Sequence, residues 1–213
     1  MRKSRFVPVL LAVGLALTSA ACTQGQSDTQ TPDGNQSQSP SRLSAAEQEA
    51  LLFTREEEKL ARDVYDALAD GRPIFDNISA SEQRHFDAIG NLLDTYGLED
   101  PTSGLAPGEF SNPDLQKLYN DLVAQGSASS DAALEVGCLI EELDIRDLDQ
   151  ALSSTTHSDI QGVYENLQRG SRNHLRAFYG NLTSNGGDYT PVHLEQATFD
   201  QIVNSDKETG GGH

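Results

Sequence analysis

A Glu-x-x-His pair lies on the apolar face of a helix that the sequence predicts over residues 79–96. At helical spacing, Glu82 and His85 share one face with an apolar stripe made of Phe86, Ile89, Leu92, Leu93 and Tyr96. A carboxylate and an imidazole three residues apart therefore point toward whatever this helix packs against. Burying them costs free energy unless a partner compensates, and a bound metal ion is one such partner.

The same residues allow a simpler interpretation. Ser79 and Glu82 have the spacing of a capping box, in which Glu82 only bonds back to the start of the helix. His85 would then be an ordinary, half-buried histidine. The stretch alone does not decide between these two interpretations, so the rest of the chain has to.

Composition favours helices and disfavours nucleic acid as a partner. Lys and Arg total 15 against 33 Asp and Glu, which gives a formal charge of −18. Such a chain repels the phosphates of nucleic acids. Tryptophan is absent, aromatic residues are few, and Ala, Leu, Glu, Asp and Gln dominate, so the predicted fold class is all-α.

The amino terminus has the features of an export signal. Arg2, Lys3 and Arg5 precede an apolar stretch over residues 6–21, which is too short to span a bilayer as a stable helix. The stretch ends in small residues directly before Cys22. It resembles a bacterial lipoprotein signal, although Ser19 stands where Leu is usual. The resemblance implies a signal peptide over residues 1–21, lipidation of Cys22 and anchoring to a membrane in the cell envelope. Plain secretion is the alternative.

A polar tether and one folded domain are expected after Cys22. Residues 23–42 contain no aliphatic or aromatic side chain, so residues 22–42 are predicted to be disordered. The helical domain is assigned to residues 43–204 and a flexible tail to residues 205–213. Cys138 lies in an apolar helical pattern and is predicted to be a core residue.

The helical pattern predicts four long helices, over residues 44–69, 79–96, 131–152 and 158–182. A short helix over residues 113–125 interrupts the long connection between the second and third, and another is expected near residues 194–203. No segment has a convincing strand pattern. Four long helices joined by breaks predict a helix bundle with an extra short helix in its crossover and a short C-terminal tail.

The first long helix offers two candidate ligands. Glu57 lies among Phe53, Leu60, Ala61 and Val64, whereas Glu58 lies among Leu51, Thr54, Ala61 and Tyr65, and periodicity does not separate the two. The alternative is that residues 56–58 face solvent and pair with Arg55, Lys59 or Arg62.

The spacing Glu58, Ala61 and Tyr65 resembles the first helix of ferritins, bacterioferritins and rubrerythrins. In those proteins the Glu is a terminal metal ligand and the Tyr lies near the site, which favours Glu58 over Glu57. With Glu82 and His85 following, the chain is similar to the first half of the ferritin-like di-iron carboxylate pattern. Runs 56–65, 140–145 and 170–175 are most similar to an uncharacterised prokaryotic ferritin-like domain family.

The second half of the pattern is less complete. On the third long helix, Glu141 lies in an apolar stripe, while Glu142 and Glu135 are alternatives and Glu142 is expected to face solvent. On the fourth, His174 faces inward, but Ser171 stands where the resemblance implies a second Glu-x-x-His. Five of the six ligands that such a site uses are therefore present.

The resemblance implies a ferritin-like four-helix bundle that binds iron in a dinuclear or mononuclear site, with manganese as the alternative metal. Glu58 and Glu141 would be terminal ligands, Glu82 a bridge, and His85 and His174 the nitrogen donors. Oxidation of Fe²⁺ or removal of peroxide at the envelope would follow from the family alone. The other hypothesis is a metal-free lipoprotein domain with an interaction or structural role, in which these carboxylates lie more than about 8 Å apart, too far to share one ion.

Overall fold

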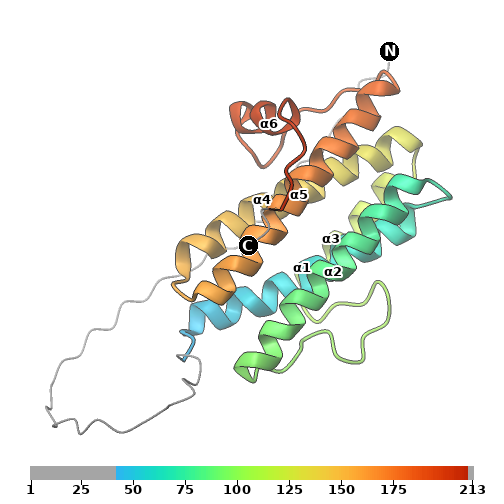
Figure 1. Ribbon diagram of the computed structural model, residues 1–213. Coiled ribbons are helices and arrows are strands. Elements are labelled where there is room, and N and C mark those ends of the chain that lie inside the picture. Colours follow the sequence, from blue (N-terminus) through green and yellow to red (C-terminus); the bar gives the residue numbers. More distant parts are fainter. Residues whose placement is uncertain (1–41, 211–213) are drawn as a thin grey trace, which may run out of the picture. The chain divides into compact units, whose positions relative to one another are not determined.

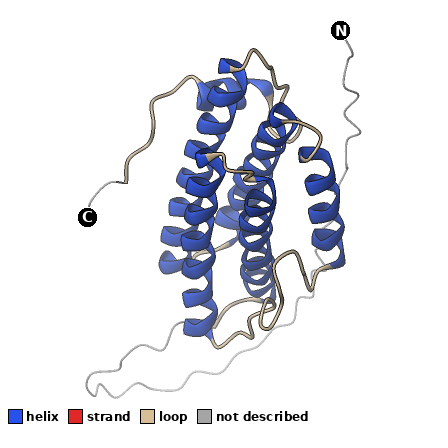
Figure 2. Ribbon diagram, turned by 90° about the vertical axis from the view of Figure 1, so that its right-hand side faces the viewer, coloured by secondary structure: helices blue, strands red, loops and turns tan. Residues whose placement is uncertain are grey.

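The computed structural model describes residues 42–210, which form six α-helices and no strand (Figures 1 and 2). The helices are α1 (Ala45–Leu68), α2 (Pro73–Tyr96), α3 (Pro113–Gly126), α4 (Ser130–Ser154), α5 (Ser158–Ser184) and α6 (Gln196–Val203). The predicted all-α class, the four long helices and the two short ones are therefore confirmed.

The four long helices form two hairpins. Helix α1 packs along α2, and α4 packs along α5, because only a few residues connect the members of each pair. The turn between α1 and α2 passes through Asp70 and Gly71, whose φ angles of 42° and 71° lie in the left-handed region. The hairpins meet where α1 contacts α4 and α2 contacts α5. Helix α3 packs on α1 and α4, and α6 packs on α5 (Figure 1).

Helix α2 begins six residues earlier than the sequence predicted. Pro73 occupies its first turn, where a missing N–H costs nothing, so the proline starts the helix and does not break the chain there. Ser79 is consequently in the middle of α2, and its hydroxyl donates a hydrogen bond to Asp66 of α1. The capping-box interpretation of Ser79 and Glu82 is therefore wrong. A true capping box starts α1, where Ser44 and Glu47 bond each other's backbone N–H groups.

Two apolar clusters pack within the domain, and a polar layer separates them along the long helices. One cluster includes Phe75 and Phe178, and the other includes Leu51 and Ile89. Cys138 is fully buried in the first cluster with a free thiol, as predicted. On α1, α2 and α5 the candidate ligands fall between segments that belong to different clusters, whereas on α4 Glu141 lies within the segment of the first cluster, before Leu148 of the second. The helices thus carry their polar residues into the interior at one common level.

The outward face of α1 holds the crossover between α2 and α3. Glu56 accepts hydrogen bonds from the backbone N–H groups of Ser111 and Asn112, at 2.7 and 3.0 Å. Lys59 donates to the Ala106 carbonyl and pairs with Asp63. These charged side chains are buried, yet each has a partner, as buried charges normally do.

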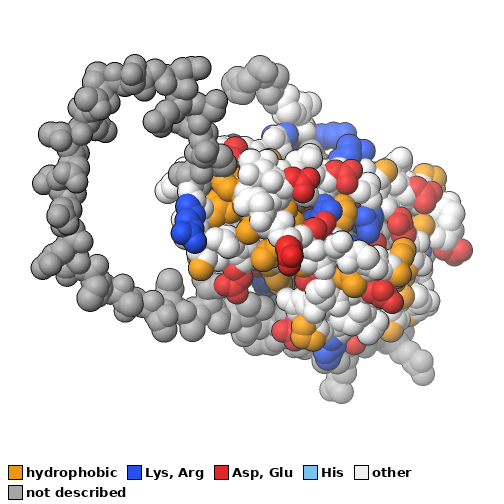
Figure 3. All heavy atoms as spheres, turned by 90° about the horizontal axis from the view of Figure 1, so that it is seen from below, with side chains coloured by type: hydrophobic (Ala, Val, Ile, Leu, Met, Phe, Trp, Pro, Cys, Tyr) orange, Lys and Arg blue, Asp and Glu red, His pale blue; other side chains and the backbone are white. Residues whose placement is uncertain are grey.

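The surface is mixed in charge. In the view of Figure 3, acidic, basic and apolar side chains are interspersed. Within residues 42–210, no helix is both long and apolar enough to cross a membrane. The predicted signal peptide (1–21), the lipidation site Cys22 and most of the tether (22–42) lie outside the described residues.

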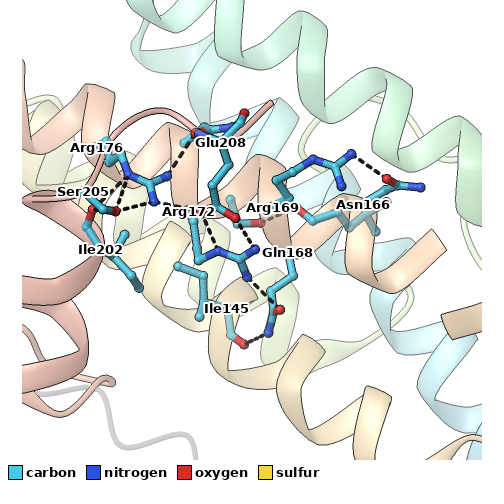
Figure 4. Close-up of polar contacts among 12 residues, drawn as sticks. Ile145, Asn166, Gln168, Arg169, Arg172, Arg176, Ile202, Ser205 and Glu208 are labelled. Carbon is cyan, nitrogen blue, oxygen red and sulfur yellow. Dashed lines mark hydrogen bonds and ion pairs between the residues drawn. The ribbon is translucent and has the colours of Figure 1, made fainter. Parts of the chain in front are cut away.

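The segment that follows α6 returns to α5 and is held there by Glu208 (Figure 4). Its carboxylate accepts two hydrogen bonds from Arg172, at 2.8 and 2.6 Å, and one from Arg176 at 2.7 Å. The Glu208 backbone also exchanges hydrogen bonds of 2.9 Å with the side chain of Asn173. The tail expected to be flexible over residues 205–213 is therefore bound to α5 as far as Glu208.

Replacing Glu208 with Gln is expected to lower the free energy of unfolding by about 1 kcal/mol at pH 7, because the ion pairs with the two arginines are partly exposed. Hydrogen bonds from Arg172 and Arg176 lower the pKa of Glu208 to about 2. The stabilisation is thus complete above the unfolded pKa near 4.5 and disappears as the pH falls toward 2. Urea titrations of Glu208→Gln at pH 7 and pH 3 measure this, with the exposed Asp206→Asn as control. Equal losses at both pH values would contradict it.

Candidate metal centre

The five residues predicted as ligands come together in the polar layer. Glu58 comes from α1, Glu82 and His85 from α2, Glu141 from α4 and His174 from α5. The three carboxylates are at most 1% exposed, and the two histidine side chains are 11–12% exposed. The carboxylates are therefore sealed in the interior, and the imidazoles form the more accessible edge of the site.

These residues form two groups that share Glu82. Glu58, Glu82 and His85 make one group, and Glu82, Glu141 and His174 make the other, with the ligand atoms of each group within 4.8 Å of one another. One Glu82 oxygen lies 2.7 Å from His85 Nδ1, and the other lies 2.7 Å from His174 Nδ1. Glu58 Oε2 and Glu141 Oε2 lie 3.3 and 3.5 Å from the imidazole of their group. Each group offers two carboxylates and one imidazole.

The short distances within the two groups are not hydrogen bonds. Both histidine Nδ1 atoms, both Glu82 oxygens, Glu58 Oε2 and Glu141 Oε2 are buried and have no hydrogen-bond partner. The six atoms approach one another closely without the alignment of donor and acceptor that a hydrogen bond requires. Buried polar atoms are nearly always paired, and a group of unpaired ones in a native protein requires an explanation.

The pKa values show that the cluster disfavours the charged forms of Glu58 and Glu141 and favours those of Glu82 and His174. Burial raises the pKa of Glu58 to about 7 and that of Glu141 to about 6. Burial also opposes ionisation of Glu82, but the two histidines outweigh it and lower the pKa of this shared carboxylate. The acidic neighbours, led by Glu82, outweigh burial in turn and raise the pKa of His174 to about 10.

The two rival glutamates lie elsewhere. Glu57 is only partly buried and faces Asp147, so the structure favours Glu58 in the cluster. Glu142, expected to face solvent, is fully buried, and that expectation is wrong. Its carboxylate accepts backbone hydrogen bonds from Val192, His193 and Leu194 at 2.7–2.9 Å and so anchors the chain before α6. Glu135 is partly exposed and belongs to neither group.

The basic residues next to residues 56–58 pair with other carboxylates. Arg55 bonds Asp100 at 2.7 Å, and both Lys59 and Arg62 bond Asp63. The hypothesis that the acidic run faces solvent and pairs with these three cations is therefore wrong. Glu58 keeps its buried oxygen Oε2 unpaired although three cations lie on the same helix.

Tyr65 and Ser171 complete the surroundings of the cluster. The Tyr65 hydroxyl donates a hydrogen bond of 2.6 Å to Glu141 Oε1, which orients that carboxylate and leaves Oε2 toward His174. The Tyr65 ring packs against Phe75 and Phe178. Ser171 is fully buried, but its hydroxyl donates back to the Leu167 carbonyl at 3.2 Å, one turn earlier on α5.

Asp144 is a polar residue of this layer that the sequence prediction missed. It lies three positions after Glu141 on α4, is 5% exposed and has an unpaired oxygen, Oδ2. The spacing of Glu141 and Asp144 equals that of Glu82 and His85, and this repeated i, i+3 spacing was the signal in the sequence that could have identified it.

Gly170 makes room for His85. A Cβ atom at this position would lie 2.5 Å from Cε1 and 2.6 Å from Nε2 of the His85 ring. The absent side chain therefore lets α5 approach α2 with the imidazole between them.

Replacing Gly170 with Ala is expected to push the His85 ring out of its group while leaving the helices intact. Because one nitrogen donor is then misplaced, we expect metal affinity at the group of Glu58 and His85 to fall at least about tenfold, measured by equilibrium dialysis with Mn²⁺. The matched control is Gly180→Ala on the same helix, where a new Cβ meets no atom within 4 Å. Unchanged affinity in Gly170→Ala would contradict the prediction.

Comparison with known proteins places the chain in a family. Residues 47–206 match the model of an uncharacterized protein domain, DUF2202. The chain belongs to the DUF2202 family. The uncharacterized protein MJ0754 of Methanocaldococcus jannaschii is 46% identical over 170 residues, which span 79% of this chain and 92% of the relative.

A crystal structure of the same relative supports the fold. The structure of the hypothetical protein MJ0754 from Methanococcus jannaschii superposes with a TM-score of 0.76 at 43% identity, and the match covers 84% of this chain and all of the other. The helical arrangement described above is therefore shared with a solved protein. Neither relative carries a name that states an activity.

Proposed function

We propose that this DUF2202 protein is a metal-binding, ferritin-like four-helix bundle whose polar layer holds two metal ions. The observation that supports it most strongly is the pair of ligand groups that share Glu82, with their buried donor atoms converging without hydrogen bonds. Two groups joined by one carboxylate offer one position for each ion. A positive charge at each position would compensate the burial of three glutamates.

The donors fit iron best and manganese next. Both groups offer carboxylate oxygens and imidazole nitrogens and no thiolate, since the sulfur of Cys138 belongs to the apolar cluster. Oxygen and nitrogen donors suit Fe²⁺ and Mn²⁺, whereas structural zinc sites usually include cysteine.

The surrounding residues would control access and charge. Apolar clusters on both sides of the polar layer exclude bulk water from the carboxylates, and the two imidazoles, with ring centres 5.6 Å apart, form its more exposed edge. A small solute would therefore reach the site beside α2 and α5. Glu58, Glu82, His85, Glu141 and His174 would hold the ions, and redox-active ions would supply the electrons for reduction of dioxygen or peroxide. Fe²⁺ oxidation or peroxide removal is therefore the activity we propose.

The alternative, a metal-free interaction or structural domain, has less support. It requires the carboxylates to lie more than about 8 Å apart, since ligands of one ion must all lie close to it. Within each group the ligand atoms are instead within 4.8 Å of one another.

We also propose that the domain works at the cell envelope. The support is the sequence alone, in which a basic start, a short apolar stretch and small residues precede Cys22. A lipid on Cys22 and the polar tether after it would hold the helical domain near a membrane surface, outside the cytoplasm.

The decisive experiment is reconstitution of the full chain with Fe²⁺ without oxygen, and separately with Mn²⁺, followed by metal analysis. We expect two ions per chain. Addition of oxygen or peroxide to the iron form should then give absorption in the near ultraviolet from Fe³⁺. A chain that binds neither ion after reconstitution would contradict the proposal.

A further inference from the structure

The two ligand groups lack one carboxylate. Ferritin-like dinuclear sites use a Glu-x-x-His on two helices, but α5 carries Ser171 where the second glutamate would stand. Ser171 does not supply the missing negative charge, and its hydroxyl donates a hydrogen bond to the Leu167 carbonyl on its own helix. The five converging residues therefore leave room for one more protein ligand.

Asp144 has the properties that this missing ligand requires. It follows Glu141 by three residues on α4, so both side chains lie on one face of that helix. It is 95% buried, since its exposed fraction is 5%, and its Oδ2 has no hydrogen-bond partner. Its unpaired oxygen is thus of the same kind as those of Glu58, Glu82 and Glu141.

The charges that most affect Asp144 are negative. Glu58, Glu141, Glu57 and Glu82 are the charged residues that most raise its pKa, although Asp144 lies outside both groups of ligand atoms. Burial, and then repulsion by these residues, raises its pKa well above the usual range. The nearest basic residue along α4, Arg146, pairs with Asp147 and contacts His193. None of the leading influences on its pKa comes from a cation.

We propose that Asp144 is the sixth protein ligand of the dinuclear centre and replaces, from α4, the carboxylate that Ser171 does not provide. This inference rests on the proposed function, because it presupposes that the two groups bind divalent cations. In this assignment α4 provides two ligands, Glu141 and Asp144, whereas α5 provides only His174. It also explains how a chain with serine at position 171 still holds two ions.

Replacing Asp144 with Asn tests the proposal, because the amide keeps the shape of the side chain and removes its negative charge. Mn²⁺ binding to the full chain is measured by equilibrium dialysis, together with the EPR signal that distinguishes coupled from isolated Mn²⁺. We expect two coupled ions in the unmodified chain. In Asp144→Asn we expect one ion with an isolated signal, and an affinity for the second at least tenfold weaker.

Three further variants make the result specific. Asp149→Asn removes one charge from an exposed position of α4 and should bind two ions normally. Ser171→Ala should also bind two, and a lost ion there would overturn the proposal by assigning the sixth ligand to the serine. Asp144→Ala repeats the test if the amide disturbs folding.

The outcomes separate the inference from the proposed function. Two coupled ions in Asp144→Asn with unchanged affinities, or a single ion both with and without Asp144, would overturn the assignment of Asp144 while leaving metal binding in place. An unmodified chain that binds no Mn²⁺ and no Fe²⁺ would overturn the proposed function, and this assignment with it.

Discussion

Replacing Glu82 with Gln is expected to abolish binding of both metal ions. Glu82 belongs to both ligand groups, and its two oxygens lie 2.7 Å from the two histidine Nδ1 atoms. The amide offers one oxygen in place of two and removes a full negative charge from a buried site. We expect affinity for each Mn²⁺ to fall at least about 100-fold in equilibrium dialysis, since metal sites in proteins depend on both charge and ligand number.

The control for this substitution is Asp87→Asn, which removes one charge from an exposed position of the same helix. It should leave both affinities unchanged. Circular dichroism confirms that the Glu82→Gln chain remains helical, so that a loss of metal is not a loss of fold. If only one of the two ions is lost, the idea of a shared bridging carboxylate is wrong.

The second large effect is expected without any metal. In the metal-free protein, Glu58→Gln should increase the free energy of unfolding by about 2 kcal/mol at pH 8. Burial raises the pKa of Glu58 to about 7, and a tenfold weaker acid costs about 1.4 kcal/mol more to ionise. The expected gain in the free energy of unfolding is smaller than the full free-energy cost of ionising Glu58. The reason is that the substitution also removes the favourable contact of Glu58 with protonated His85.

The size of this effect depends on pH. An acid whose folded pKa lies above its unfolded value of 4.5 destabilises the folded state as the pH rises from 4.5 to 7, and not below. Urea unfolding in the presence of a chelator should therefore show a gain for Glu58→Gln at pH 8 and almost none at pH 4.5. A variant that is less stable than the unmodified protein at pH 8 would contradict it. With Mn²⁺ present the order should reverse, because only the unmodified chain has its full ligand set.

The inward face of each long helix could be predicted from the sequence. Glu82, Glu141 and His174 lie in apolar stripes of 3.6-residue period, and such stripes identify the buried face whatever it packs against. Periodicity alone did not separate Glu57 from Glu58, because adjacent residues on a helix are only about 100° apart. That choice needed either a resemblance or the packing of α1 on α4.

The residues that were predicted wrongly depend on contacts distant in the sequence. Glu142 is buried because the chain before α6 folds back and donates three backbone hydrogen bonds to its carboxylate. No local sequence pattern could indicate a partner about fifty residues away. Glu208 is held by Arg172 and Arg176 for the same reason. The predicted start of α2 was too late for a local reason. A proline can either follow the end of one helix or occupy the first turn of the next, and Pro73 does the second.

The position of the polar layer between two apolar clusters has a consequence for the motions of the protein. Helices usually fray at their ends and stay closed in the middle. Here Phe75 and Phe178 pack on one side of the layer and Leu51 and Ile89 on the other, while the mutually repelling Glu58, Glu141 and Asp144 occupy the centre. Without bound cations the central turns should exchange their amide hydrogens faster than the turns that flank them. Bound cations would then hold the central turns of the long helices together and slow amide exchange most in those turns.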